Sequence, residues 1–199
     1  MEMTSLGPFA GLILAGGEGR RWGCPKAWAR LPDGRTFLEA CFGILYDAGA
    51  RPIVATLPPG AGDPRLEGLS TVVLPAPGLD MFASLKAALD RVMEFPDWEK
   101  TALLPVDHPL ITTVAVATLV SAPAPAAILS YRGKHGHPVC VARSVVEKIV
   151  GGELTGPTLR DVLRTVDAVE VPVDDIGVVS NCNTPEALSA ALNASNSEL

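Results

Sequence analysis

A glycine-rich loop with two cations follows the first apolar run of the chain. The segment from residue 14 to residue 26 reads LAGGEGRRWGCPK. Glycines allow backbone N–H groups to approach a phosphate chain closely, and side chains such as Arg21 and Lys26 can neutralise its charge. We therefore expect this loop to bind the phosphates of a nucleoside triphosphate.

The two commonest nucleotide-binding loops do not match this segment. The dinucleotide pattern G-x-G-x-x-G accommodates Gly17 and Gly19 but meets Trp22 at its third glycine, and no Gly-Lys-Ser/Thr of the Walker type is present. The carboxylate of Glu18 would repel phosphate unless it points to solvent or pairs with Arg20. A nicotinamide-dependent oxidoreductase of the Rossmann type stays an alternative, and it predicts tight binding of that cofactor.

A single carboxylate follows the apolar run from residue 102 to residue 106. Asp107 comes at the end of this predicted strand, and Pro109 then prevents further strand pairing. Carboxylate and phosphate oxygens are the ligands that Mg²⁺ prefers. Asp107 is therefore a candidate magnesium ligand; the alternative is an aspartate that only forms a turn.

Short apolar runs alternate with helix-like stretches along the chain. This alternation predicts an α/β fold with three layers, in which a mostly parallel sheet is flanked by helices. Ligands of such sheets bind outside the carboxyl ends of the strands. We expect a single domain over residues 1–199, with a frayed tail after residue 193. The predicted strands are Ala10–Ala15, Pro52–Thr56, Thr71–Leu74, Ala102–Val106, Ala126–Tyr131, Pro138–Ala142 and Ala168–Val173, and the predicted helices are Thr36–Asp47, Phe82–Phe95, Thr113–Val120, Val145–Val150, Pro157–Val166 and Pro185–Asn193.

The composition is that of a folded globular protein and argues against a nucleic-acid coat. Hydrophobic residues make up 48% of the chain and charged residues 19%, and the net charge of −6 comes with no basic stripe for nucleic acid. The four cysteines form no C-x-x-C pair, which favours free thiols over a zinc site or a disulfide framework. No stretch has the apolar length of a membrane span. We therefore expect a cytoplasmic protein.

The glycine loop resembles the signature L-A-G-G-x-x-x-R-x-G-x-x-K of a family of small nucleotidyltransferases. These are the cytidylyltransferases and guanylyltransferases that activate molybdopterin. The resemblance implies a Rossmann-like nucleotidyltransferase fold in which Arg21 and Lys26 neutralise the triphosphate, while Trp22 stands where the family usually has methionine. It also implies that base and phosphates are held by Leu14, Ala15, Gly16, Gly17 and Gly19.

Two segments with candidate metal ligands resemble the same family. The Val-Asp-x-Pro segment carries Asp107, which the resemblance makes a catalytic residue and a ligand of Mg²⁺. Residues 180–186 read SNCNTPE, whereas the family has D-x-D-T-P-E, so both acidic positions are asparagine here. Asn183 would then be a neutral metal ligand; the alternative is that it only caps the following helix.

Two further segments resemble the family at the nucleoside and acceptor sides. The resemblance places Gly78 and Ser84 beside base and ribose, in the first turn of a helix whose apolar face also packs in the core. Lys134 and His137 lie in a segment like the family's G-H-P-V and would border the acceptor. A plain glycine turn is the alternative for that segment.

The resemblance implies that a phosphorylated acceptor attacks the α-phosphate of CTP or GTP with Mg²⁺ bound, and that pyrophosphate leaves. Val-Asp-His-Pro, Gly-His-Pro-Val and Asn-Thr-Pro-Glu favour a molybdopterin cytidylyltransferase, whereas Leu-Ala-Gly-Gly favours the guanylyltransferase form. The product would pass to a molybdoenzyme or its chaperone. A transferase with another phosphorylated acceptor is one alternative. A regulatory or partner protein that binds nucleotide but has weakened catalysis is the other, because of Asn181 and Asn183.

Overall fold

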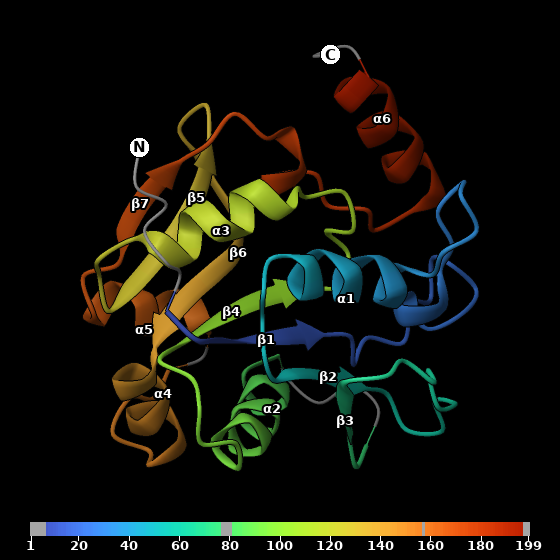
Figure 1. Ribbon diagram of the computed structural model, residues 1–199. Helices are drawn as coiled ribbons and strands as arrows, with labels where there is room; N and C mark the ends of the chain where they lie inside the picture. The colour runs from blue at the N-terminus through green and yellow to red at the C-terminus, as the bar shows by residue number, and fades with distance from the viewer. Residues whose placement is uncertain (1–6, 77–80, 157, 197–199) are drawn as a thin grey trace.

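The computed structural model describes residues 7–76, 81–156 and 158–196, and these residues form one sheet with helices on both faces (Figure 1). The strands of this described part are β1 (Phe9–Leu14), β2 (Ile53–Leu57), β3 (Leu69–Val73), β4 (Lys100–Pro105), β5 (Ala126–Tyr131), β6 (Lys134–Ala142) and β7 (Val169–Pro172). They lie in the order β3-β2-β1-β4-β6-β5-β7. Every adjacent pair is parallel except those of β6, which is antiparallel to both β4 and β5. The predicted mostly parallel sheet is confirmed.

The helices cover the two faces of the sheet and make the three predicted layers (Figure 1). Over the described residues they are α1 (Phe37–Asp47), α2 (Met81–Met93), α3 (Thr113–Ser121), α4 (Arg143–Val150), α5 (Leu159–Thr165) and α6 (Pro185–Asn196), with short 3-10 helices η1 (Lys26–Trp28) and η2 (Ile176–Val178). Side chains of α1, α3 and α6 belong to the apolar core on one face, and those of α2, α4 and α5 to the core on the other. Among these described helices, none is long and apolar enough to cross a bilayer.

The strand β6 begins earlier than the sequence predicts. Its first residue is Lys134 rather than Pro138, because Lys134 pairs with Tyr131 across a tight hairpin. Arg132 and Gly133 form the turn with φ angles of 49° and 78°, a left-handed conformation that suits glycine and closes a two-residue hairpin. The sequence pattern thus shows only the apolar second half of β6. Its first half lacks apolar residues and was not predicted.

Threonines cap the starts of several described helices, including α5 and α6. The helix α5 follows Thr158, whose hydroxyl accepts a backbone N–H of the first turn at 3.3 Å; Pro157, the predicted start, lies outside the described residues. The helix α6 follows Thr184, whose hydroxyl accepts in the same way at 3.2 Å, as its position before a proline predicts. α6 continues to Asn196, beyond its predicted end at residue 193.

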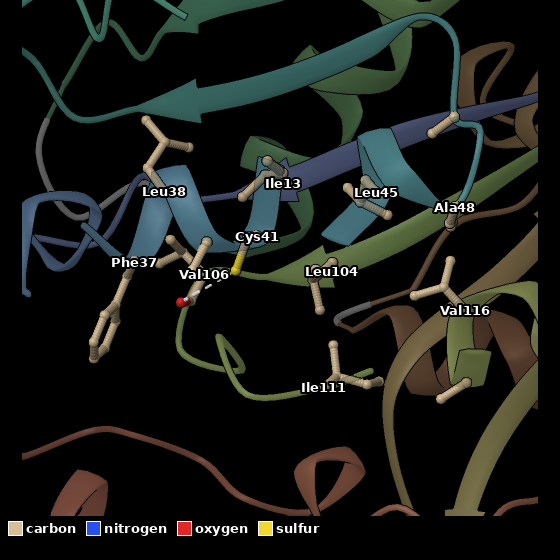
Figure 2. Close-up of a cluster of buried hydrophobic side chains, with 14 of the residues drawn as sticks. Ile13, Phe37, Leu38, Cys41, Leu45, Ala48, Leu104, Val106, Ile111 and Val116 are labelled. Atoms are coloured by element: carbon tan, nitrogen blue, oxygen red, sulfur yellow. Dashed lines mark hydrogen bonds between the residues drawn. The ribbon is translucent and has the colours of Figure 1, made fainter. Parts of the chain in front are cut away.

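The helix α1 packs on the sheet where β1 and β4 lie (Figure 2). Thr36 and Glu39 form a reciprocal capping box that fixes its start, since Thr36 Oγ1 accepts from the N–H of Glu39 at 3.1 Å and Glu39 Oε2 accepts from the N–H of Thr36 at 2.6 Å. Further along, the thiol of the fully buried Cys41 donates to the carbonyl of Val106 at 3.6 Å. This packing holds the chain in place directly before Asp107.

The strands β1 and β4 end side by side at one edge of the sheet. Leu14 pairs with Pro105 in parallel register, and the N–H of Val106 donates to the carbonyl of Leu14 at 3.1 Å. Because the two strands are parallel, the glycine loop and Asp107 leave the sheet at the same edge. The position of ligand sites in parallel sheets predicts the functional site here.

Candidate active site

An open cavity of about 610 Å³ lies at this edge of the sheet. The glycine loop and the ends of β1, β2 and β4 supply most of its lining, α2 contributes one serine, and the segment before α6 contributes one asparagine. The lining residues are Leu14, Gly16, Gly17, Glu18, Gly19, Arg20, Arg21, Lys26, Thr56, Ser84, Pro105, Val106, Asp107 and Asn183. Most of the residues singled out in the sequence are therefore brought to one cavity.

The glycines of the loop serve two different purposes. Gly19 has a φ of 63°, and a Cβ there would lie 1.9 Å from the carbonyl oxygen of Cys24, so the loop cannot close with any other residue. Gly17 has open space around it, because a Cβ there would meet no atom within 4 Å. Gly19 is thus required for the conformation of the loop. Gly17 has no side chain to cover its backbone, so a ligand in the cavity can approach that backbone closely.

The cations of the loop differ in their surroundings. Arg20 Nε lies 2.9 Å from Glu18 Oε2, with side chains 87% and 35% exposed, so of the two arrangements that the sequence left open for Glu18 the structure shows the pair with Arg20. Arg21 is exposed and lines the cavity. Lys26 is much less exposed, at 22% of its side chain, and belongs to η1 at the end of the loop. The site therefore holds two exposed arginines and one half-buried lysine.

Lys26, Asp107 and Asn183 come together at the base of the site. Lys26 Nζ donates to Asp107 Oδ2 at 2.8 Å and to Asn183 Oδ1. Burial by itself raises the pKa of Asp107, but the hydrogen bond and charge of Lys26 outweigh it and hold that pKa below its usual range. Asp107 is therefore an anion at neutral pH, and its carboxylate forms an ion pair with Lys26.

The segment that carries Asn183 is tied to the rest of the site through its neighbour Cys182. The N–H of Cys182 donates to the carbonyl of Asp107 at 2.8 Å, and its own carbonyl accepts from Trp22 Nε1 at 3.2 Å. The indole also packs edge-on against Phe37, with ring centroids 5.2 Å apart. Trp22 thus links the glycine loop to the segment that carries Asn183, a contact that the sequence did not reveal.

The cavity lining includes a threonine that the sequence analysis did not single out as a site residue. Thr56, at the end of β2, is fully buried at 0% exposure, and its Oγ1 accepts the N–H of Ala15 at 3.1 Å. Ala15 is itself buried and acts on the site through this bond rather than by lining the cavity. Ser84 lines the cavity as predicted. Gly78, its predicted companion, lies outside the described residues.

The two acceptor-side candidates do not line this cavity. Lys134 is exposed at the β5–β6 hairpin. His137 packs its ring against His108, with centroids 4.9 Å apart, and its Nδ1 is buried without a hydrogen-bond partner. Burial, reinforced by the neighbouring His108, lowers the pKa of His137 to about 4, so the ring is neutral at pH 7. Both residues belong to β6, next to β4.

The donors around Lys26 are suited to a hard cation. No cluster of three or more His, Cys, Asp or Glu side chains that could enclose a metal occurs in the described part of the chain. Asp107 and Asn183 instead present two oxygens that already converge on an ammonium group. Mg²⁺ characteristically takes one or two protein oxygens and completes its shell with substrate phosphates and water. The residues present therefore fit Mg²⁺ held together with a nucleotide.

A mostly parallel sheet with a glycine loop, cations and a carboxylate where β1 and β4 end is the arrangement expected of a nucleotidyltransferase. The chain belongs to the family of the MobA-like NTP transferase domain, whose model matches residues 11–173. The resemblance drawn from the loop and its companion segments is thus confirmed.

Individual relatives agree with this assignment over nearly the whole chain. The chain is 27% identical over 195 residues to a molybdenum cofactor guanylyltransferase of Xanthomonas euvesicatoria, covering 94% of this chain and 96% of the relative. A mycobacterial protein from Mycobacterium sp. strain JC1 superposes with a TM-score of 0.73 and 27% identity, over 94% of this chain and 98% of that one. Molybdopterin-guanine dinucleotide biosynthesis protein A of Archaeoglobus fulgidus shares the fold, with a TM-score of 0.65 and 20% identity over 94% and 99% of the two chains.

Proposed function

We propose that this protein transfers a nucleoside monophosphate from a nucleoside triphosphate to molybdopterin and releases pyrophosphate. The observation that carries the proposal is the convergence of bare glycine backbone, Arg21, Lys26 and Asp107 on one cavity. Two relatives bear the name molybdenum cofactor guanylyltransferase, which for one of them reads 'probable'. This chain covers more than nine-tenths of the length of each. This favours GTP as the donor over the CTP expected from the sequence segments.

The proposed reaction needs alignment and charge stabilisation more than proton transfer. An oxygen of the acceptor phosphate attacks the α-phosphorus, and the bond to the bridging oxygen of the β-phosphate breaks. A phosphate monoester is already ionised near neutral pH, so it needs no general base. The protein's task is to hold both reactants in line and to stabilise the negative charge that moves onto pyrophosphate.

Each part of the site has a task in this reaction. The backbone around Gly17 donates N–H groups to the phosphates, and Arg21 and Lys26 stabilise charge on the β- and γ-phosphates and on the leaving group. Asp107 and Asn183 are the oxygens that would hold Mg²⁺, which when bound supplies divalent charge to the phosphate oxygens. Leu14 and Ser84 line the same cavity and would contact the nucleoside.

The strand β6 supports an acceptor side beyond the end of β4. His137 and Lys134 lie on this strand, and β6 is hydrogen-bonded to β4, which delivers Asp107. The neutral ring of His137 would offer a hydrogen bond rather than a charge to the acceptor. Both residues would therefore contact the acceptor from outside the cavity described above.

Thermal shift and pyrophosphate release together test the proposal. GTP or CTP with Mg²⁺ should raise the melting temperature, because a ligand that binds only the native state stabilises it. Arg21→Met should reduce this shift, whereas Arg35→Met, which removes an exposed arginine remote from the cavity, should leave it unchanged. Pyrophosphate should then appear when molybdopterin is added.

The same assay separates the alternative functions. Asn181 and Asn183, which stand at positions that are acidic in the family's pattern, favour a nucleotide-binding regulatory protein as the second candidate. Nucleotide binding without pyrophosphate release from any phosphorylated acceptor would support that candidate and sink the transferase proposal. Release with an isoprenoid or sugar phosphate but not with molybdopterin would keep the reaction class and change the acceptor.

A further inference from the structure

A single lysine occupies the position where the two candidate metal ligands meet. Lys26 Nζ is bonded to Asp107 Oδ2 at 2.8 Å and to Asn183 Oδ1. The side chains of Lys26 and Asp107 are only 22% and 13% exposed, so this contact is largely shielded from water. The oxygens that a metal ion would need are therefore already engaged by an internal cation.

An ammonium group and a divalent cation compete for these two oxygens. A charged N–H donor lies about 2.8 Å from its acceptor oxygen and points a hydrogen at a lone pair. Mg²⁺ binds oxygens at about 2.1 Å, so it must approach the same atoms more closely than the ammonium group does. Two cations at one poorly exposed carboxylate repel each other, since little water screens them. Lys26 in this position therefore weakens the binding of a metal ion to Asp107 and Asn183.

The cavity offers Lys26 a different partner once a nucleotide is present. Lys26 lines the cavity together with Arg21 and the bare backbone of Gly17, so phosphates held by that loop lie within reach of the ammonium group. Lysine carries a compact charge on a flexible four-carbon stem and exchanges partners readily. Movement of the ammonium group onto the phosphates would release both oxygens.

We propose that Lys26 closes the metal position in the free protein and that a nucleoside triphosphate opens it by drawing Lys26 onto its phosphates. This inference rests on the proposed function only in taking a nucleoside triphosphate as the ligand. Metal and nucleotide then bind as a pair, and by linkage each raises the affinity of the protein for the other by the same factor. The free protein retains divalent metal only weakly.

Binding of Mn²⁺ to the full-length protein without nucleotide tests the inference. Free Mn²⁺ is measured by electron paramagnetic resonance, so neither turnover nor an acceptor is involved. Lys26→Met removes the ammonium group and keeps an apolar stem; we expect it to bind Mn²⁺ on the order of tenfold more tightly than the wild type. Arg21→Met is the matched control, because it removes one positive charge from the same cavity without a bond to Asp107 or Asn183. Its Mn²⁺ affinity should change by less than about twofold.

The remaining outcomes are decisive in either direction. Adding Asp107→Asn to Lys26→Met should abolish the tightened binding and so assign it to Asp107. No tightening in Lys26→Met, or equal tightening in Arg21→Met, would overturn the inference. If circular dichroism shows that Lys26→Met does not fold, Lys26→Gln provides the same comparison. Failure of the proposed function would instead appear as absent nucleotide binding or pyrophosphate release while Lys26→Met still binds Mn²⁺ tightly.

Discussion

The substitution Asp107→Asn separates the chemical role of this residue from its structural role. Asparagine has nearly the same shape as aspartate, and its carbonyl oxygen can still accept the hydrogen bond of Lys26. The backbone bond between the Asp107 carbonyl and the N–H of Cys182 does not depend on the side chain. The change therefore removes one negative charge from a carboxylate that is 13% exposed and leaves the local framework in place.

The expected loss of activity is much larger than the expected loss of stability. Removal of a preorganised charge at a shielded site costs roughly 100-fold in rate, or about 2.7 kcal/mol of transition-state stabilisation. In the folded protein, the contact with Lys26 outweighs the burial of Asp107, and asparagine keeps the hydrogen-bond part of that contact. We expect the free energy of unfolding to fall by only about 1 kcal/mol.

The loss of rate is measured as pyrophosphate release with saturating nucleoside triphosphate and molybdopterin. The loss of unfolding free energy is measured by urea denaturation. Asp33→Asn is the matched control, because Asp33 is a 48%-exposed carboxylate that pairs with Arg35 away from the cavity. The control should retain wild-type turnover. Turnover of Asp107→Asn within about twofold of the wild type would refute the role assigned to this carboxylate.

Three further predictions concern the loop, its anchor and the acceptor side. Gly19→Ala should abolish the thermal shift by nucleotide because its Cβ has no room, whereas Gly17→Ala, which has room, should retain the fold and weaken the shift only partly. Trp22→Phe leaves the carbonyl oxygen of Cys182 without its hydrogen-bond donor, so urea denaturation should show that the free energy of unfolding falls by about 1 kcal/mol. An unchanged midpoint would argue against a stabilising contact between Trp22 and Cys182. Burial lowers the pKa of His137 to about 4 from its usual 6.5, so on acidification the unfolded chain binds the proton first. The free energy of unfolding should therefore fall by about 3 kcal/mol between pH 6.5 and pH 4, and His137→Gln should flatten this decline.

Local sequence patterns were sufficient for the order of most strands and helices and for the place of the glycine loop after β1. Alternating apolar runs and helical stretches predicted the strands and helices, because burial on both faces of a parallel sheet demands continuous apolar residues. The start of α6 was predictable because Thr184 and Pro185 act on the residues next to them. The hairpin that lengthens β6 was missed, since residues 134–137 lack the apolar side chains by which the sequence pattern marks a strand.

The partners inside the site were beyond the reach of such patterns. Thr56 supports Ala15 from a strand 41 positions away, and Trp22 reaches Cys182 across 160 positions. No spacing rule connects residues so far apart, because their contact depends on the order of strands in the sheet and on how loops fold over its edge. The inward packing of His137 depends in the same way on the rest of the fold.

The sequence by itself determined the kind of chemistry available to this protein. The glycines, Arg21, Lys26 and Asp107 are recognisable because a phosphate loop and a strand-end carboxylate are properties of short continuous segments. Only the tertiary structure decided that Lys26 lies between Asp107 and Asn183, which are 81 and 157 positions away from it. The parallel pairing of β1 with β4 and the return of the chain before α6 bring these three side chains together, because strand order and loop path decide which distant residues meet.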